Sequence, residues 1–203
     1  SVDSFGQLAI YTSFTTFLAV LSTGRYELAI GLPKEDDDAL RIFKLILLIG
    51  LGVSFFYFIG VFLLKEVFNI YDSTRLLSNR EAYLAPAYIF FIAIHSALNF
   101  WKHRQKRYKE ITISNALQVI SSTIFSIVLG YFDVQNGMIW ALAGGIIVAC
   151  TYYFHNEPLL FYRIINKSNI NRVFKEYIAF PKYMTFSDLS LVASQQFIPI
   201  LFS

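Results

Sequence analysis

Long apolar runs without a strand-like alternation of polar and apolar positions occupy most of this 203-residue chain. Six of these runs contain no Asp, Glu, Lys or Arg, and they lie at about 4–24, 45–64, 82–101, 111–132, 134–156 and 189–203. A helix needs about 20 mainly apolar residues to cross the hydrocarbon core of a bilayer. Strands of a membrane barrel would instead alternate in polarity over about 10 residues. The pattern therefore predicts membrane-spanning helices.

We expect an all-α fold, a polytopic membrane helical bundle of about six transmembrane helices. With their flanking residues, the predicted spans are 4–31, 40–64, 82–101, 111–132, 134–160 and 185–203. Between the last two, segment 169–180 places Ile170, Val173 and Phe174 on one helical face. This amphipathic pattern predicts a short helix on the cytoplasmic surface of the membrane.

Composition agrees with this fold and excludes several classes of function. Hydrophobic residues make up 56% of the chain and charged residues only 15%, against about 25% in soluble domains. The one cysteine, Cys150, excludes an intramolecular disulfide and offers no cluster of metal ligands. No phosphate-binding loop, dinucleotide fingerprint or nucleophile elbow is present. We expect no enzymatic activity, no metal, no cofactor and no nucleic-acid partner.

The placement of basic residues predicts the orientation. Segments 25–44, 102–110 and 157–182, which fall on one side of the membrane, contain fourteen of the seventeen Lys and Arg residues. The other side receives only Lys65, Arg75 and Arg80. Because basic loops remain in the cytoplasm, the first side is predicted to be cytoplasmic.

Arg25 and Glu27 continue the first span toward the cytoplasm and are the strongest candidates for a binding site. Arginine within a membrane segment usually faces a protein interior or a water path, because its desolvation is costly. Its planar, permanently charged fork suits a phosphate group. The alternative is an Arg25 side chain that extends to the membrane surface. Their i, i+2 spacing predicts that Arg25 and Glu27 do not pair directly on one helix.

Other polar residues recur inside the spans at helical spacing. Asn99 lies one turn after His95 in the third span. Asn115, Gln118 and Ser122 share one face of the fourth. These side chains predict either a shared hydrated cleft or hydrogen bonds between helices, and the sequence leaves both interpretations open.

Several short segments resemble the polysaccharide, or O-antigen, flippase family of the multidrug/oligosaccharidyl-lipid/polysaccharide exporter superfamily. Their order and spacing relative to the spans fit that family over nearly the whole chain. The matching segments are RYELAI at 25–30 with LPK at 32–34, ALNFW at 97–101 with HRQKRYK at 103–109, IS at 113–114, LQ at 117–118 and FPKY at 180–183.

The resemblance implies one lobe of a two-lobed transporter in a bacterial inner (cell) membrane. The chain enters a span at once and ends within another, so we expect a fragment whose first span and second lobe are missing. Such a protein moves lipid-linked oligosaccharides, typically on undecaprenyl pyrophosphate, between leaflets by alternating access. Its partners would be this substrate, membrane lipids and the remaining lobe of the same polypeptide. By this resemblance, Arg25 would help to hold the pyrophosphate or an acidic sugar.

Two other classes remain as alternatives. A drug or metabolite antiporter of the same superfamily would require carboxylates inside the membrane, and Glu27 is the only acid in this sequence expected to point inward. A membrane-bound polysaccharide polymerase or acyltransferase would require large extramembrane loops or a His/Asp/Arg cluster at the membrane surface. The short outer loops lack histidine, which makes the enzyme the weaker alternative.

Overall fold

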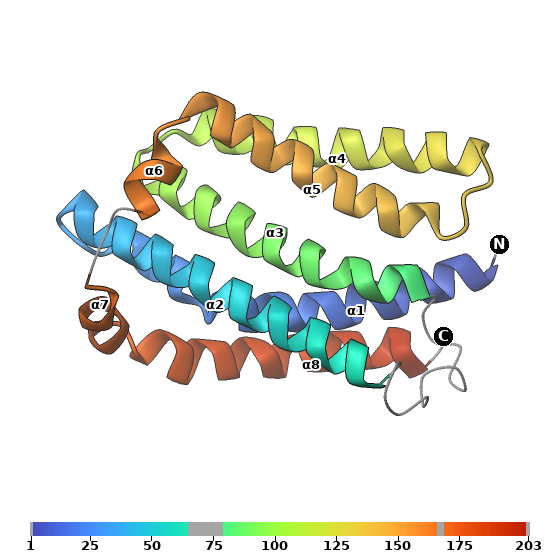
Figure 1. Cartoon of the computed structure of the whole chain (residues 1–203), viewed down its shortest axis with the longest axis horizontal. Coiled ribbons are helices and arrows are strands. Elements are labelled where there is room, and N and C mark those ends of the chain that lie inside the picture. The colour runs from blue at the N-terminus through green and yellow to red at the C-terminus, as the bar shows by residue number, and fades with distance from the viewer. Residues whose placement is uncertain (1, 65–78, 166–168, 202–203) are drawn as a thin grey trace.

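The computed structural model describes residues 2–64, 79–165 and 169–201, and within them every regular element is a helix (Figure 1). The elements in chain order are α1 (Val2–Thr23), η1 (Tyr26–Gly31), α2 (Asp36–Phe62), α3 (Asn79–Arg104), α4 (Tyr108–Tyr131), α5 (Gly137–Asn156), α6 (Leu160–Ile165), α7 (Ile170–Glu176), η4 (Phe180–Thr185) and α8 (Phe186–Leu201). The element η1 is a 3-10 helix, and η4 is a π-helix.

Five of these helices are long and apolar enough to cross a membrane. They contain the stretches Phe5–Thr23, Asp36–Phe62, Arg80–Arg104, Tyr108–Tyr131 and Gly137–Asn156. The predicted all-α polytopic bundle is therefore confirmed. The sixth predicted span, 185–203, corresponds to α8, which has 16 residues, and residues 202–203 lie outside the described part.

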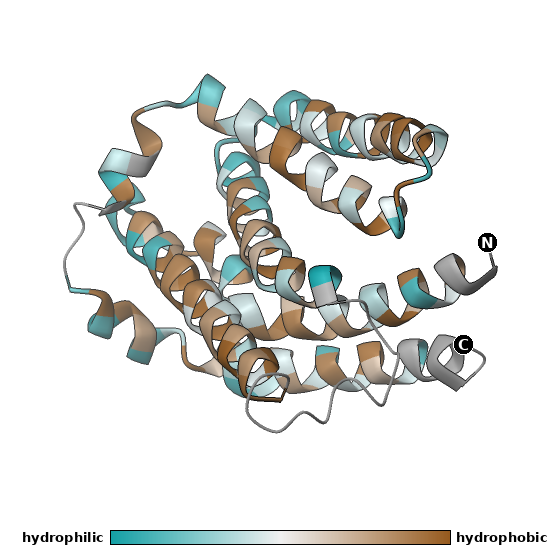
Figure 2. Cartoon of the chain, turned by 45° about the vertical axis from the view of Figure 1, so that its right-hand side comes forward, coloured by the Kyte–Doolittle hydropathy of each residue, from teal (hydrophilic) through white to brown (hydrophobic). Residues whose placement is uncertain are grey.

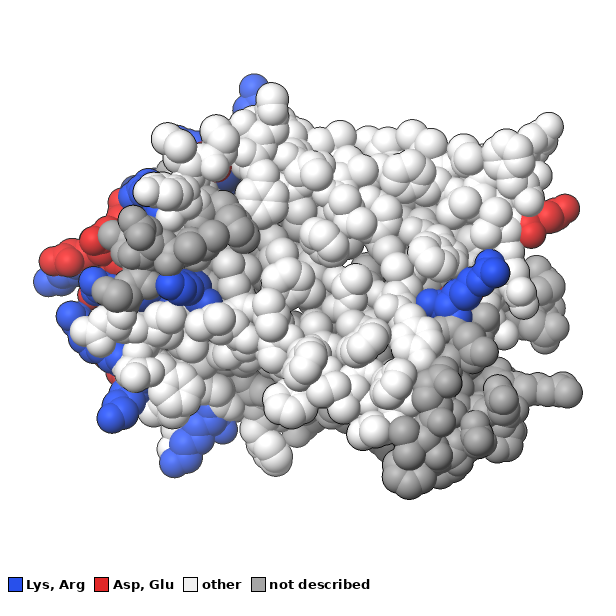
Figure 3. All heavy atoms as spheres, viewed as in Figure 1, with Lys and Arg blue, Asp and Glu red and all other residues white. Residues whose placement is uncertain are grey.

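The long helices run side by side along the long axis of the molecule (Figure 1). Brown apolar residues cover much of the helix surfaces, with teal polar residues concentrated toward the turns (Figure 2). Charged side chains gather at the end near α6 and α7, and the middle of the visible face has none (Figure 3). We call this the basic end; it comprises residues 24–44, 102–110, 157–165 and 169–185. Lys65 and Arg75, assigned by sequence to the other side, lie outside the described residues.

The region predicted as one span over 4–31 is divided into two elements. Helix α1 ends at Thr23, and Gly24 and Arg25 both adopt left-handed backbone conformations, with φ of 54° and 57°. Glycine tolerates such a conformation at a helix end, and the Gly24 amide donates back to the carbonyls of Val20 and Leu21. The chain therefore turns at the basic end before η1 begins.

Two further boundaries differ from the predicted ones because of local breakers. The span predicted over 134–160 ends as α5 at Asn156, just before Pro158, which disfavours helical geometry in the residue preceding it. The surface helix predicted over 169–180 is the seven-residue α7, and the π-helix η4 follows it. Val173 of α7 is fully buried and packs with α2 rather than facing outward.

The bundle contains two clusters of buried side chains. The larger lies toward the basic end and joins η1, α2, α3, α5, α6 and α7 around residues such as Ile30, Phe43 and Trp101. The smaller lies toward the opposite end, where Tyr11 of α1 packs with Ala85 and Ile89 of α3 and Ile139 of α5. These two clusters hold the helices together and so position the polar residues described next.

Candidate functional site

Arg25 lies at the basic end, where its guanidinium meets two carboxylates. Its Nη1 is 3.3 Å from Oε1 of Glu27, and its Nε is 2.5 Å from Oδ2 of Asp188 at the start of α8. The Arg25 side chain is 28% exposed, whereas Glu27 is only 2% exposed. Arg25 is therefore half-buried and ion-paired, and water reaches part of its side chain.

The prediction that Arg25 and Glu27 would not pair is wrong. It assumed one continuous α-helix, in which residues i and i+2 point in different directions. The left-handed conformation at Arg25 and the tighter 3-10 geometry of η1 bring the two side chains to the same side. Asp188 is a partner that sequence reasoning missed, because it is far from Arg25 in the chain.

The short helix η1 is held in place by contacts from two directions. The Tyr26 hydroxyl donates to the Phe174 carbonyl of α7 over 3.2 Å, and burial raises the pKa of this tyrosine. From α3, Arg104 donates to the carbonyls of Ile30, Pro33 and Lys34 at 3.2, 2.6 and 3.3 Å. These bonds satisfy carbonyls that a helix end leaves unpaired. They also fix the segment that carries Arg25.

Asn99 belongs to a different group, a buried hydrogen-bond network between α3, α4 and α5. Its amide nitrogen is 3.3 Å from Nδ1 of His95, and its amide oxygen accepts from the Tyr153 hydroxyl. Nε2 of His95 is 3.2 Å from Oγ of Ser114, which donates to the Ala149 carbonyl at 3.4 Å. For Asn99, the contacts therefore match the interhelical interpretation.

The polar face predicted on α4 contains three residues with different surroundings. Asn115 is exposed, and Gln118 and Ser122 are half-buried. The Ser122 hydroxyl donates to the Gln118 carbonyl at 2.7 Å, and both atoms lie against Gly145 of α5. A methyl group added at Gly145 would come within 1.9 Å of the Ser122 oxygen. This part of the face therefore packs closely on α5.

A buried ion-pair network joins α3, α4 and the end of α5. Nζ of Lys102, whose side chain is 0% exposed, lies 2.7 Å from Oε2 of Glu110 and 2.9 Å from Oε1 of Glu157. Arg107 also meets Glu157, at 2.8 Å, and Trp101 donates to it at 3.2 Å. Burial alone would raise the pKa of the Glu157 carboxyl, but the contacts with Lys102, Trp101 and Arg107 lower it overall.

A second buried carboxylate corrects the expectation that only Glu27 points inward. Glu81, in the first turn of α3, is 2% exposed, and its Oε2 has no hydrogen-bond partner among the described residues. The Tyr11 hydroxyl and the Gln7 amide oxygen, both on α1, are also buried without a hydrogen-bond partner in that part of the chain. These atoms lie toward the end of the bundle opposite the basic end.

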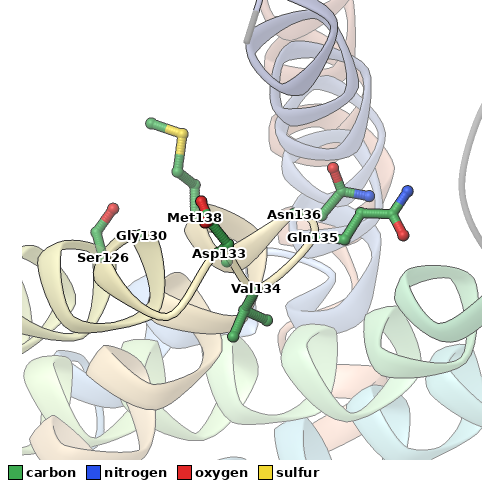
Figure 4. A pocket seen from close by; sticks show the side chains of 8 residues that line it. Ser126, Gly130, Asp133, Val134, Gln135, Asn136 and Met138 are labelled. Atoms are coloured by element: carbon green, nitrogen blue, oxygen red, sulfur yellow. The ribbon is translucent and has the colours of Figure 1, made fainter.

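A surface pocket of about 380 Å³ lies at the turn between α4 and α5 (Figure 4). Its lining includes Ser126, Asp133 and Met138 on one side of the turn, while Gln135 and Asn136 project together on the other (Figure 4). None of the six residues predicted as a binding site lines it.

The contacts thus divide those six residues into three groups: Arg25 with Glu27, Asn99 alone in its network, and Asn115, Gln118 and Ser122 on α4. Fold and polar groups together define a polytopic α-helical membrane protein with buried charges. Comparison of the chain with protein-family models, curated proteins and solved structures finds no match.

Proposed function

We propose that this chain forms one lobe of a flippase that moves lipid-linked oligosaccharides across the bacterial inner membrane by alternating access. The substrate class is an undecaprenyl-pyrophosphate-linked repeat unit, and the second lobe would come from the same polypeptide. The proposal rests on the sequence resemblance together with one structural observation, the half-buried Arg25.

Arg25 has the properties that binding of a phosphate at the membrane surface requires. It is 28% exposed, so an anion can approach it, and its backbone is fixed by η1 and the Gly24 turn. An arginine fork can make two parallel charge-assisted hydrogen bonds to phosphate oxygens. It lies at the basic end, which the positive-inside rule assigns to the cytoplasm, where the flippase would take up its substrate.

Two carboxylates already neutralise Arg25, and this sets a condition on binding. Glu27 is buried on the same short segment, whereas Asp188 comes from α8, which packs against α1 and η4. A phosphate would replace Asp188 rather than Glu27, because Asp188 is itself 28% exposed and can return to water. Displacement of α8 from α1 would then accompany substrate entry.

The proposal is tested by surface polysaccharide in a flippase-null strain that carries the full-length protein. We expect Arg25→Ala to lose most of the polysaccharide at normal protein abundance, and Arg25→Lys to be partly defective because lysine keeps the charge but not the fork. Arg172→Ala is the matched control, because Arg172 also pairs with an aspartate at the basic end but is 59% exposed. Normal polysaccharide in Arg25→Ala would refute the role of Arg25.

A second candidate, a drug or metabolite antiporter, gains support from Glu81. The sequence counted against this class because it predicted only one inward-facing acid, whereas two carboxylates are buried. Ion-coupled transporters commonly use carboxylates within membrane segments. Export of small amphipathic compounds by the full-length protein, with no effect on surface polysaccharide, would favour the antiporter over the flippase.

A further inference from the structure

The segment that joins α7 to α8 carries a small apolar pocket at the surface of the protein (Figure 1). The pocket has a volume of about 130 Å³, and it is lined by Ala179, Phe180, Tyr183 and Met184. Phe180 also packs against the larger core cluster and so joins the pocket to the bundle. Tyr183 and Met184 are 63% and 48% exposed, so this wall of the pocket faces the surroundings of the protein.

The local sequence explains why the helix is irregular at this pocket. Pro181 follows Phe180 and has no N–H to donate to the preceding turn, so it interrupts the α-helical hydrogen bonds. The chain forms the π-helix η4 here, which has the wider i→i+5 pattern. Ala179 lies one turn before Tyr183, and its single methyl group leaves space between the larger side chains.

The bundle holds this segment in one orientation. Val173 of α7 is fully buried and packs with α2, and Arg172 of α7 pairs with Asp38 of α2 at 3.1 Å. Phe174 and Ile178, in contrast, are exposed. One side of α7 and η4 is therefore fixed to the protein, and the other presents apolar side chains that no described residue covers.

A cation lies at the edge of the pocket. Nζ of Lys182 is 5.2 Å from the centre of the Tyr183 ring, and this cation–π contact places the ammonium beside the pocket lining. In the described part of the chain, no carboxylate pairs with Lys182. The acids that flank it in the sequence, Glu176 and Asp188, both pair with arginines. The charge of Lys182 is therefore available to an anion from outside the chain.

We propose that the pocket and Lys182 bind one anionic phospholipid of the surrounding bilayer, with part of an acyl chain in the pocket and the phosphate at the ammonium. An apolar pocket beside an unpaired cation matches the two parts of such a lipid, and exposed tyrosines such as Tyr183 are typical of the headgroup layer. The positive-inside rule assigns the basic end to the cytoplasm, whose leaflet carries anionic lipids that attract basic residues. The site requires no transported substrate, so it is independent of the flippase proposal.

The test measures lipid binding to the full-length protein by native mass spectrometry. The protein, purified in detergent, is titrated with dioleoyl-phosphatidylglycerol or with dioleoyl-phosphatidylcholine, which has the same acyl chains but no net charge. We expect phosphatidylglycerol to bind more tightly, and Lys182→Gln to weaken its binding about fivefold with no effect on phosphatidylcholine. Lys109→Gln is the matched control, because Lys109 is an exposed lysine at the basic end that does not line the pocket; it should bind as the wild type does.

A second variant tests the pocket separately from the charge. Ala179→Leu would fill part of the pocket and should weaken the binding of both lipids. Because Ala179 and Lys182 are both exposed, we expect both variants to fold normally. Equal wild-type affinities for the two lipids would overturn the proposal, as would equal losses in Lys182→Gln and Lys109→Gln.

Two other results would assign this surface to a different occupant and so also overturn the proposal. Tighter binding of undecaprenyl phosphate than of phosphatidylglycerol, lost in the same two variants, would assign the pocket to a carrier lipid. Binding of neither phospholipid by the full-length protein would indicate that another part of the polypeptide covers the pocket.

Discussion

Removal of the Lys102 ammonium should destabilise the bundle more than any other change of one charge at its basic end. Its Nζ contacts two carboxylates, of Glu110 and Glu157, and the side chain has no exposed surface. In Lys102→Met the stem is kept, and the two carboxylates lose their shared cation while Arg107, which is 47% exposed, is left as the nearest positive charge. The perturbation therefore isolates the ion pairs from the packing of the stem.

The magnitude follows from the burial of the three partners. Breaking a buried ion pair by removing one partner costs about 3–5 kcal/mol. Glu110 and Glu157 are 23% and 17% exposed, so water can partly solvate them, and we expect a loss at the low end, about 3 kcal/mol. For a chain of this size, that loss corresponds to a fall in Tm of roughly 6–12 °C.

The chain provides its own probe for this measurement. Cys150 is the one cysteine and is 1% exposed, so a fluorogenic thiol reagent reports unfolding in detergent. Lys109→Met is the matched control, because Lys109 is exposed in the first turn of α4 and its loss should change stability by less than about 0.5 kcal/mol. Equal melting temperatures for Lys102→Met and Lys109→Met would refute the reasoning. In the double variant Lys102→Met/Glu157→Gln, part of the loss should be recovered, because one uncompensated carboxylate is gone.

Three further outcomes can be measured with the same reagent. Because the folded-state pKa of Glu157 is lowered, its ionised carboxylate stabilises the folded state fully above the ordinary glutamate pKa of about 4.3. Melting temperatures should fall as the pH drops from there through the lowered folded-state value. A melting temperature that stays constant in acid would contradict this. Gly145→Ala should cost about 1–3 kcal/mol, because its new methyl group would lie 2.8 Å from the backbone oxygen of Gln118, whereas Gly52→Ala, with no atom within 4 Å, should be neutral or stabilising. Arg104→Lys should destabilise nearly as much as Arg104→Ala, because one ammonium cannot reproduce a fork that bonds to three carbonyls; full stability of the lysine variant would argue against that geometry.

Apolar run length was sufficient to predict five helices of membrane-spanning length, because lipid imposes a minimum length and excludes unpaired backbone. The break after Thr23 was also visible in principle, because Gly24 comes directly after Thr23 and glycine commonly ends helices. Pro33, nine residues later, is a second residue that interrupts a helix. The segment between them, YELAIG, is itself apolar enough to resemble a continuing span. Composition alone could not show that it folds back as η1 and is buried by α2 and α3 rather than by lipid.

Lys102 shows where sequence reasoning lacked the relevant information. It is one of five basic residues in segment 102–109, and all of them were expected to face the cytoplasm. Helical phase places Lys102 one turn after Leu98 and two turns after Ile94, both of which are buried. This phase was a usable signal, but a lysine on a buried face is stable only if carboxylates meet it there. Glu157 is distant in sequence, and only the fold brings it close.

The two buried carboxylates lie at opposite ends of the bundle and have different surroundings. Glu27, at the basic end, shares the Arg25 guanidinium with Asp188 of α8, so it has a cation partner within the described structure. Glu81, at the other end, has no such cation among the described residues. An anion that displaces Asp188 would leave Arg25 paired with Glu27 and would remove the ion pair that joins α8 to this segment.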